Sequence, residues 1–544
     1  MQNFKKLVAG SFVLNLALAF NAWALPPDAT PDLAVYIPGS QSNDPAFGFL
    51  VNNISVANAV CLDAPNSAGT GTSHIYFQSG INDNYSAIYC YTDDTKIPGL
   101  TTGDATNHHK SKIWISRRRL GASFVGLDAV NHGTLLTYLK DPVTAGCTAS
   151  IGSYSSGGAT YQYHYTCTTA TAGIAATAAT SDVTPDVFGA ADNVTPGSTP
   201  INAAQLDNVH ALGGHIVGIP VTLLLRNALQ YAEIQSGLLP NTCTVGDETA
   251  KCVPSLSKEQ LVSLFTGAIT DWSQFQVDGS NTLVDVVAAG VSAGVSPPTG
   301  TNPHGGLQNP TDTTVHVCRR ENGAGQQVAV LANVLQYPCL GATAPELATP
   351  ATATLGDIQY ATSLGAVDKC LADYNDGTST WFGTTNPSPY PNPPSAGTAH
   401  GTQWALSIQT TERNATNKAN YRFIAIDSAI PTGLEAYLGH YRLVGNYALS
   451  WKSASNSANQ NAALNAIAAY SKLPTTIAAR NISLSNQSFG QAGYIALSDN
   501  GYTPPLVWDP TNPVTPYSKL DAHGKPNACV LPTANTNYGQ VQLQ

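Results

Sequence analysis

The 544-residue chain is acidic and carries little charge. It has 24 Lys and Arg against 34 Asp and Glu, a net charge of −10, and charged residues make up only 11% of it, where roughly 25% is usual. An apolar fraction of 43% argues against a disordered chain, and an acidic chain supplies no electrostatic footprint for nucleic acid. The length allows two to four domains, or one large two-lobed unit with insertions.

Residues 1–24 have the pattern of an export signal. Lys5 and Lys6 precede an apolar run over 7–20, and Ala22-Trp23-Ala24 has the small-x-small form that a signal peptidase reads. The run is shorter than the roughly 20 apolar residues that a membrane span needs, and no second segment is long enough. We therefore expect cleavage after Ala24 and an exported protein, periplasmic or extracellular, with no transmembrane segment and no lipid anchor.

The rest of the mature chain alternates short strand patterns with helical ones, which favours an α/β layer architecture. Strands are predicted over 33–37, 112–116, 217–225 and 313–317. A helix is predicted over 257–265, capped by Ser257 with Gln260 and ended at Gly267, and another over 461–472, stopped by Pro474. Turn-rich composition predicts surface loops over 168–181, 292–312 and 386–401 and a surface-wrapping tail over 481–544.

The cysteines are even in number, which in an exported chain indicates disulfides. They are Cys61, Cys90, Cys147, Cys167, Cys243, Cys252, Cys318, Cys339, Cys370 and Cys529. Neighbour spacing suggests the pairs Cys61–Cys90, Cys147–Cys167, Cys243–Cys252 and Cys318–Cys339, leaving Cys370 with Cys529, although spacing does not fix connectivity. No metal-ligand spacing occurs among these residues, so we expect neither a metal nor another cofactor.

The strongest candidate for chemistry is the stretch 317–327. A predicted strand runs into Arg320 and then into a Gly323-Ala324-Gly325 turn that opens a helix. Free backbone N–H groups and a guanidinium fork suit an oxyanion, although an ordinary strand-to-helix turn with a surface arginine would look the same. Similar turns follow two other predicted strands, at 39–42 and 121–123. In an open α/β sheet such turns can meet in one crevice.

The order of five segments resembles the type II periplasmic solute-binding proteins of the phosphate-binding kind, the substrate-capturing components of ABC importers. The matching segments are 35–42, 186–192, 256–272, 320–326 and 426–432, with Gly439-His440-Tyr441 after the last. The stretch 256–272, which ends in Trp272, is the most specific of them.

This resemblance implies a two-lobed α/β fold with mixed sheets flanked by helices, a hinge between the lobes and large loop insertions. The lobes would be 25–215 and 216–425, with a return to the first lobe over 426–480 and an extension over 481–544. The cleft would be lined by Ser40, Ser42, Ser123, Asp192, Arg320, Gly323, Ala324, Gly325 and Gln326.

One cleft residue sets selectivity in that family, an aspartate that accepts a hydrogen bond from a protonated phosphate oxygen and so excludes sulfate. The resemblance assigns this role to Asp192. Asn322, Ala324 and Gln326 depart from the family pattern of Asp, Ser and Thr, so this chain offers the ligand fewer hydroxyl donors.

The expected function is capture of a small oxyanion, most readily phosphate, in a cleft between two lobes, with an ABC importer permease or a cell-surface assembly as partner. An enzyme is not expected, because neither a His-Glu-x-x-His motif nor a metal-ligand cluster occurs. The alternative is an extracellular or cell-surface structural or adhesive protein that reuses the fold without binding phosphate. The Thr-, Asn- and Pro-rich insertions and the low charge suggest it.

Overall fold

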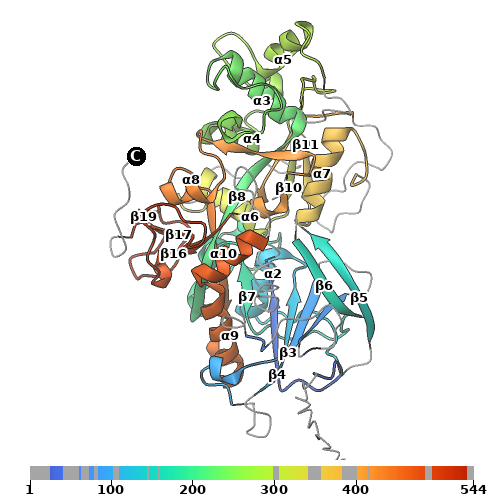
Figure 1. Cartoon of the computed structure of the whole chain (residues 1–544), viewed down its shortest axis with the longest axis vertical. Coiled ribbons are helices and arrows are strands. Elements are labelled where there is room, and N and C mark those ends of the chain that lie inside the picture. Colours follow the sequence, from blue (N-terminus) through green and yellow to red (C-terminus); the bar gives the residue numbers. More distant parts are fainter. Residues whose placement is uncertain are drawn as a thin grey trace, which may run out of the picture.

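A computed structural model of the chain describes residues 25–40, 60–62, 71, 73–78, 84–101, 110–143, 146–156, 159–297, 305–340, 357–382, 401–414, 417–483 and 493–535. The predicted signal segment, Ser42 and most of the predicted loop over 386–401 lie outside these ranges. The described chain is a mixed α/β structure with mixed sheets (Figure 1), which confirms the predicted fold class. Within it, no helix is both long and apolar enough to cross a bilayer.

Six strands form a sheet in the N-terminal part of the chain, in the order β1-β4-β3-β2-β6-β5. They are β1 (Leu33–Pro38), β2 (Ser73–Gln78), β3 (Tyr85–Tyr91), β4 (Lys112–Arg118), β5 (Cys147–Ser156) and β6 (Ala159–Cys167). β1 pairs with β4 and β2 with β6 in parallel, and the other pairs are antiparallel. The strands predicted over 33–37 and 112–116 are therefore confirmed.

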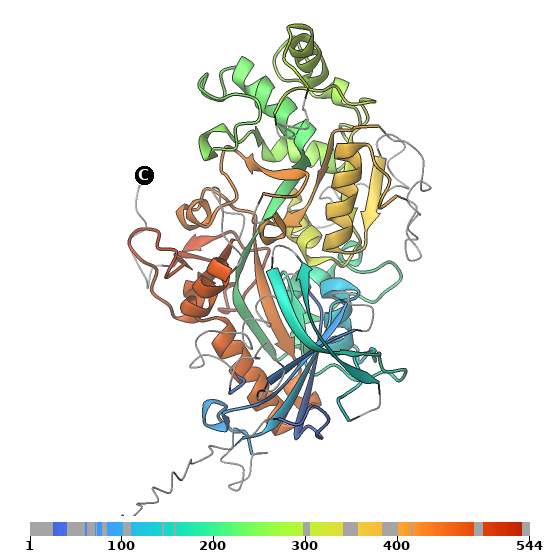
Figure 2. The same cartoon turned by 45° about the vertical axis from the view of Figure 1, so that its right-hand side comes forward.

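The second sheet is organised around β8 (Asn208–Thr222), which runs along the long axis of the molecule (Figure 2). Its first part pairs with β15 (Val444–Trp451) and its last part with β14 (Tyr421–Ile426), both antiparallel. The other strands are β7 (Ala179–Ser181), β9 (Ser255–Leu256), β10 (His316–Arg320), β11 (Asp357–Ala361), β12 (Ala405–Ser407), β13 (Gln409–Thr410), β16 (Tyr494–Leu497) and β17 (Val514–Thr515). One long strand thus ties the lower and upper parts of the molecule together.

The helices surround these sheets. They are α2 (Ala122–Asn131), α3 (Leu223–Gln235), α4 (Lys258–Phe265), α5 (Leu283–Ser292), α6 (Gly325–Val330), α7 (Leu364–Asp376), α8 (Gly433–Leu438), α9 (Ala458–Ser471) and α10 (Pro474–Ser483). The capping box of α4 is confirmed, because Ser257 accepts from the Gln260 amide and Gln260 from that of Ser257. Gly267 follows with φ 72°, the left-handed conformation that favours glycine.

Several predicted boundaries are wrong for local reasons. The strand predicted over 217–225 ends at Thr222, because the Thr222 side chain accepts from the Leu225 amide and starts α3. The strand predicted over 313–317 begins at His316 and continues to Arg320. Pro474 begins α10, since the first position of a helix needs no N–H donor.

Two stretches predicted to lie on the surface instead join the sheet. Residues 179–181, at the end of a predicted loop, form β7, which is buried and pairs with β15. β16, from the predicted tail, pairs with β8 and with β17. These short runs form strands because partners distant in sequence lie beside them.

Five disulfides join the ten cysteines, and two of the suggested pairings are wrong. Cys61–Cys90, Cys147–Cys167 and Cys243–Cys252 are confirmed. Cys318 is bonded to Cys370, because α7 packs its buried Cys370 against β10. Cys339 is bonded to Cys529, 190 residues away, so the C-terminal segment is fixed covalently to the centre of the molecule.

The Cys339–Cys529 bridge gives a direct test of this topology. Peptide mapping without reduction is expected to recover Cys339 linked to Cys529, and a peptide linking Cys318 to Cys339 would contradict the fold. Replacing both Cys339 and Cys529 by serine should lower stability by about 2–5 kcal/mol, as removal of native disulfides does, in chemical denaturation. The Cys243→Ser, Cys252→Ser double variant is the control for the loss of a short-range bridge, with a separation of 9 residues.

A buried carboxyl group makes stability depend on pH. Glu412 is 4% exposed, and burial raises its pKa from 4.5 to about 7. Between these two values the folded chain holds a proton that the unfolded chain has released, so stability is fully present below pH 4.5 and falls as pH rises towards 7. The loss for this group reaches up to about 3 kcal/mol. Glu412→Gln should flatten that part of the pH profile in urea unfolding, and an unchanged slope would refute the assignment.

Candidate functional site

The residues that follow β1 contact a buried aspartate, Asp182. Gly39 has φ 128° and lies so close to β7 that a Cβ atom there would be 1.9 Å from the Thr180 carbonyl oxygen. This close approach lets the Ser40 amide donate to the Thr180 carbonyl at 3.0 Å and the Ser40 hydroxyl donate to Oδ1 of Asp182. Ser40 is 0% exposed and Asp182 1%.

A second hydroxyl reaches the same carboxylate from the start of α2. The Ser123 hydroxyl donates to Oδ2 of Asp182 at 3.1 Å and accepts from the Asp182 amide at 3.1 Å. One carboxylate oxygen is thus held by Ser40 and the other by Ser123. Because a carboxylate has about four acceptor sites, Asp182 retains capacity to accept another hydrogen bond.

A buried arginine holds the backbone of the segment that carries Ser40. Arg117 is 2% exposed and donates to the Ile37 carbonyl at 2.6 Å and the Ser40 carbonyl at 3.1 Å. Burial lowers its pKa to about 9, so it remains a cation at neutral pH. Arg117 therefore fixes the backbone that carries Ser40, and its positive charge interacts with Asp182.

The turn after β10 supplies the opposite wall. Arg320 is 2% exposed, with Nη2 3.0 Å from Glu321 Oε1 and Nη1 donating to Gln326 Oε1 at 3.4 Å. Its buried Nε has no hydrogen-bond partner in the described part of the chain. Arg319 faces elsewhere, towards Asn322 and the Tyr360 hydroxyl. Asn322 therefore orients Arg319 rather than Arg320.

Two glycines bring this turn against α2 and Asp182. The Gly323 carbonyl accepts from the Phe124 amide at 3.0 Å. A Cβ atom at Gly325 would lie 2.5 Å from Ser123 Oγ and 2.6 Å from Asp182 Cβ. Only glycine leaves room at 325 for that approach.

A small cavity of about 20 Å³ lies between these walls, lined by Asp182, Arg320, Gln326, Arg119 and others. That is space for about one water molecule, so a ligand of several heavy atoms enters only if the walls separate. Two arginines and one carboxylate among the lining residues give the cavity a positive balance.

The structure brings together most of the predicted cleft residues. Ser40, Ser123, Arg320, Gly325 and Gln326 meet around Asp182, and Gly323 with the fully buried Ala324 forms the supporting turn.

The predicted carboxylate is elsewhere. Asp192 is exposed and accepts from the Tyr337 hydroxyl at 2.6 Å, and it is not among the residues that line the cavity. Sequence reasoning missed Asp182 and Arg119. The available signal was the run 178–182, in which small and β-branched residues end in an acid just before the turn at Pro185.

Comparison with known proteins gives distant structural neighbours only. No family model and no curated protein matches the chain. Among solved structures, it is similar to a putative phosphate ABC transporter substrate-binding protein with bound phosphate from Clostridium perfringens, with a TM-score of 0.32 and 11% identity over 80% of this chain and 92% of the other. For an ABC-type phosphate transport receptor from Vibrio cholerae, the TM-score is 0.31 and the identity is 12%, over 80% of this chain and 93% of the other. For PstS from Borrelia burgdorferi, the TM-score is 0.28 and the identity is 10%, over 80% of this chain and 92% of the other. Superpositions at this level define no residue-by-residue correspondence, so the functional argument rests on the site.

Proposed function

We propose that this chain is an exported solute-binding protein that captures a small protonated oxyanion, phosphate first, in the pocket around Asp182. The observation that supports it is that Ser40 and Ser123 both donate to the buried Asp182 carboxylate, while Arg320 lines the same small cavity as Asp182. These groups come from turns at the ends of different strands, in line with the crevice that the resemblance implies.

In the proposed site, the arginines recognise the negative charge of the anion and Asp182 recognises its proton. Arg320 and Arg119 attract the anion, and the unpartnered Nε of Arg320 donates to one of its oxygens. Asp182, held as an acceptor by two hydroxyl donors, accepts the O–H of a protonated phosphate oxygen. Sulfate carries no proton at neutral pH, so it would face the Asp182 carboxylate without a hydrogen bond between them, which is the costly arrangement.

The small cavity implies a motion. Ser40, Ser123 and Asp182 come from one side of the pocket, and Arg320 with Gln326 comes from the turn after β10 on the other. We place these two sides on separate lobes that part to admit the anion and close over it. The ligand contacts both sides only in the closed form, so binding shifts the population towards closure.

Calorimetry of the chain beginning at Leu25, with phosphate, arsenate and sulfate, tests this proposal. Phosphate and arsenate should bind and sulfate should not. Arg320→Ala should weaken phosphate binding about 10- to 100-fold, as expected for a buried charged hydrogen bond. Arg319→Ala is the matched control, because Arg319 faces Asn322 and Tyr360. No heat with any of the three anions would contradict the proposal and favour the structural or adhesive alternative.

A further inference from the structure

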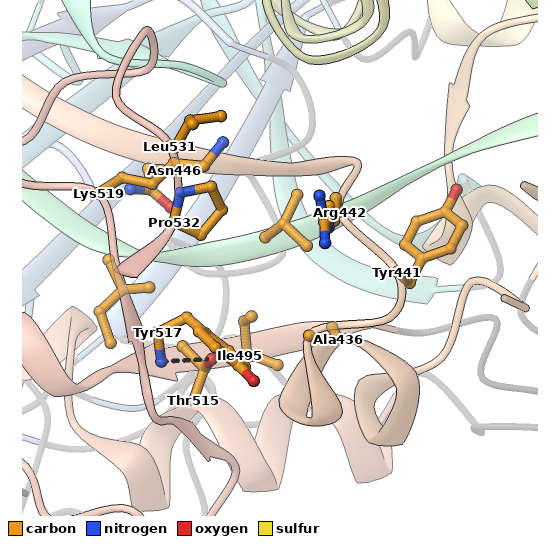
Figure 3. A pocket seen from close by; sticks show the side chains of 13 residues that line it. Ala436, Tyr441, Arg442, Asn446, Ile495, Thr515, Tyr517, Lys519, Leu531 and Pro532 are labelled. Atoms are coloured by element: carbon orange, nitrogen blue, oxygen red, sulfur yellow. Dashed lines mark hydrogen bonds between the residues drawn. The ribbon is translucent and has the colours of Figure 1, made fainter. Parts of the chain in front are cut away.

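A larger cavity lies away from the Asp182 pocket, where the C-terminal segment covers β15 and α8. It has a volume of about 250 Å³, slightly below the range of roughly 300–1,000 Å³ that is common for small-molecule sites. None of its lining residues lines the Asp182 pocket. Figure 3 shows Arg442, Asn446 and Lys519 around one space, with Ile495 and Ala436 on its opposite side.

Its polar groups are placed for a ligand. Asn446 is only 7% exposed, and its side chain lines the cavity. The Arg442 guanidinium also has no ion-pair or hydrogen-bond partner among the described residues, and its side chain points to the same space. A bound anion that accepts hydrogen bonds from the Asn446 amide and from the exposed Arg442 guanidinium would be stabilised.

The charge balance of the lining selects an anion. Lys519 adds a second cation at the edge, where its Nζ bonds to Asn333. None of the described lining residues is acidic. A neighbouring cavity shares Gly439 and Arg442 but contains Asp427, so an anion is favoured on the Asn446 side of Arg442.

The remaining walls are apolar. Ala436, Ile495 and Leu497 are buried around the cavity, and Leu531 with Pro532 lies at its edge, where Leu531 is 73% exposed. If the hydrocarbon part of a ligand lay against Leu531, apolar surface of both would be removed from water, which is favourable. Such walls do not suit inorganic phosphate, which needs hydrogen-bond donors on all sides.

We propose that this cavity binds a small organic carboxylate with an apolar body. The carboxylate lies between Arg442, Asn446 and Lys519, and the hydrocarbon part lies against Ile495, Leu497 and Leu531. The site is independent of the anion pocket at Asp182 and does not rest on the function proposed for it.

Octanoate is the probe, with 1-octanol and octyltrimethylammonium as neutral and cationic counterparts of similar length. Calorimetry and thermal unfolding should show saturable binding of octanoate, with the neutral and cationic probes at least tenfold weaker. Arg442→Gln should weaken octanoate about tenfold, the value of one charged hydrogen bond, and Ala436→Leu should abolish binding by filling the cavity. Lys418→Gln, which removes an exposed cation elsewhere, should leave it unchanged.

Two results would overturn this proposal. One is equal affinity for octanoate and 1-octanol together with no effect of Arg442→Gln, because the anion would then not be recognised. The other is no saturable octanoate binding up to millimolar concentration by the folded protein. Phosphate calorimetry on Arg442→Gln separates the two sites, since its phosphate binding should equal that of the unchanged chain whether or not phosphate binds.

Discussion

Asp182→Asn is expected to admit sulfate to a site that otherwise takes phosphate. The substitution removes the negative charge that faces the anion and replaces one acceptor by an N–H donor, which suits a fully deprotonated oxyanion. Phosphate loses the acceptor for its O–H, at a cost of about 1.5–3 kcal/mol for a hydrogen bond to a charged group. The ratio of phosphate to sulfate affinity, measured by calorimetry at one pH and ionic strength, should fall at least tenfold.

Asp192→Asn is the matched control for that experiment. It makes the same chemical change at the carboxylate predicted from sequence, which the structure places on the surface against Tyr337. Its phosphate-to-sulfate ratio should equal that of the unchanged chain. If Asp192→Asn alters the ratio and Asp182→Asn does not, the assignment of the two carboxylates is reversed.

Gly325→Ala should damage the same site by steric means. The new methyl group would lie 2.5 Å from Ser123 Oγ and 2.7 Å from Asp182 Oδ2, and Ser40 and Ser123 hold the carboxylate in place. Overpacking of this kind costs about 1–3 kcal/mol, and relief by moving Asp182 would break the site. Phosphate affinity should fall more than tenfold, together with a lower melting temperature.

Gly279→Ala controls for the general effect of adding a methyl group. Gly279 is exposed, has no heavy atom within 4 Å of an added Cβ and does not need a left-handed backbone. Its melting temperature and phosphate affinity should stay unchanged. Full phosphate binding by Gly325→Ala would show that the close approach of the turn to Asp182 does not matter to the ligand.

Local signals in the sequence were sufficient for some elements. The α4 helix could be predicted because its cap, its apolar face and its ending glycine all lie in the one short stretch 257–267. The turn at 320–326 could be predicted as part of a site because a strand, an arginine and two glycines occur in one stretch.

Other features depend on partners that lie far away in the chain. Residues 178–182 look like a loop, but pairing with β15 makes 179–181 a strand, and Asp182 directly after it reaches Ser40 and Ser123. The bonding of Cys339 to Cys529 depends on the return path of the C-terminal segment, which no spacing rule contains. The cavity beside Arg442 is formed by that same segment and could not be anticipated either.

A crystal structure of the protein grown in phosphate tests the central claim most directly. The account predicts one phosphate between the two walls of the opened and reclosed pocket, with one oxygen within hydrogen-bond distance of the Asp182 carboxylate and another at Arg320. Phosphate bound at a different place, or a pocket that stays closed and empty while calorimetry records binding, would contradict it.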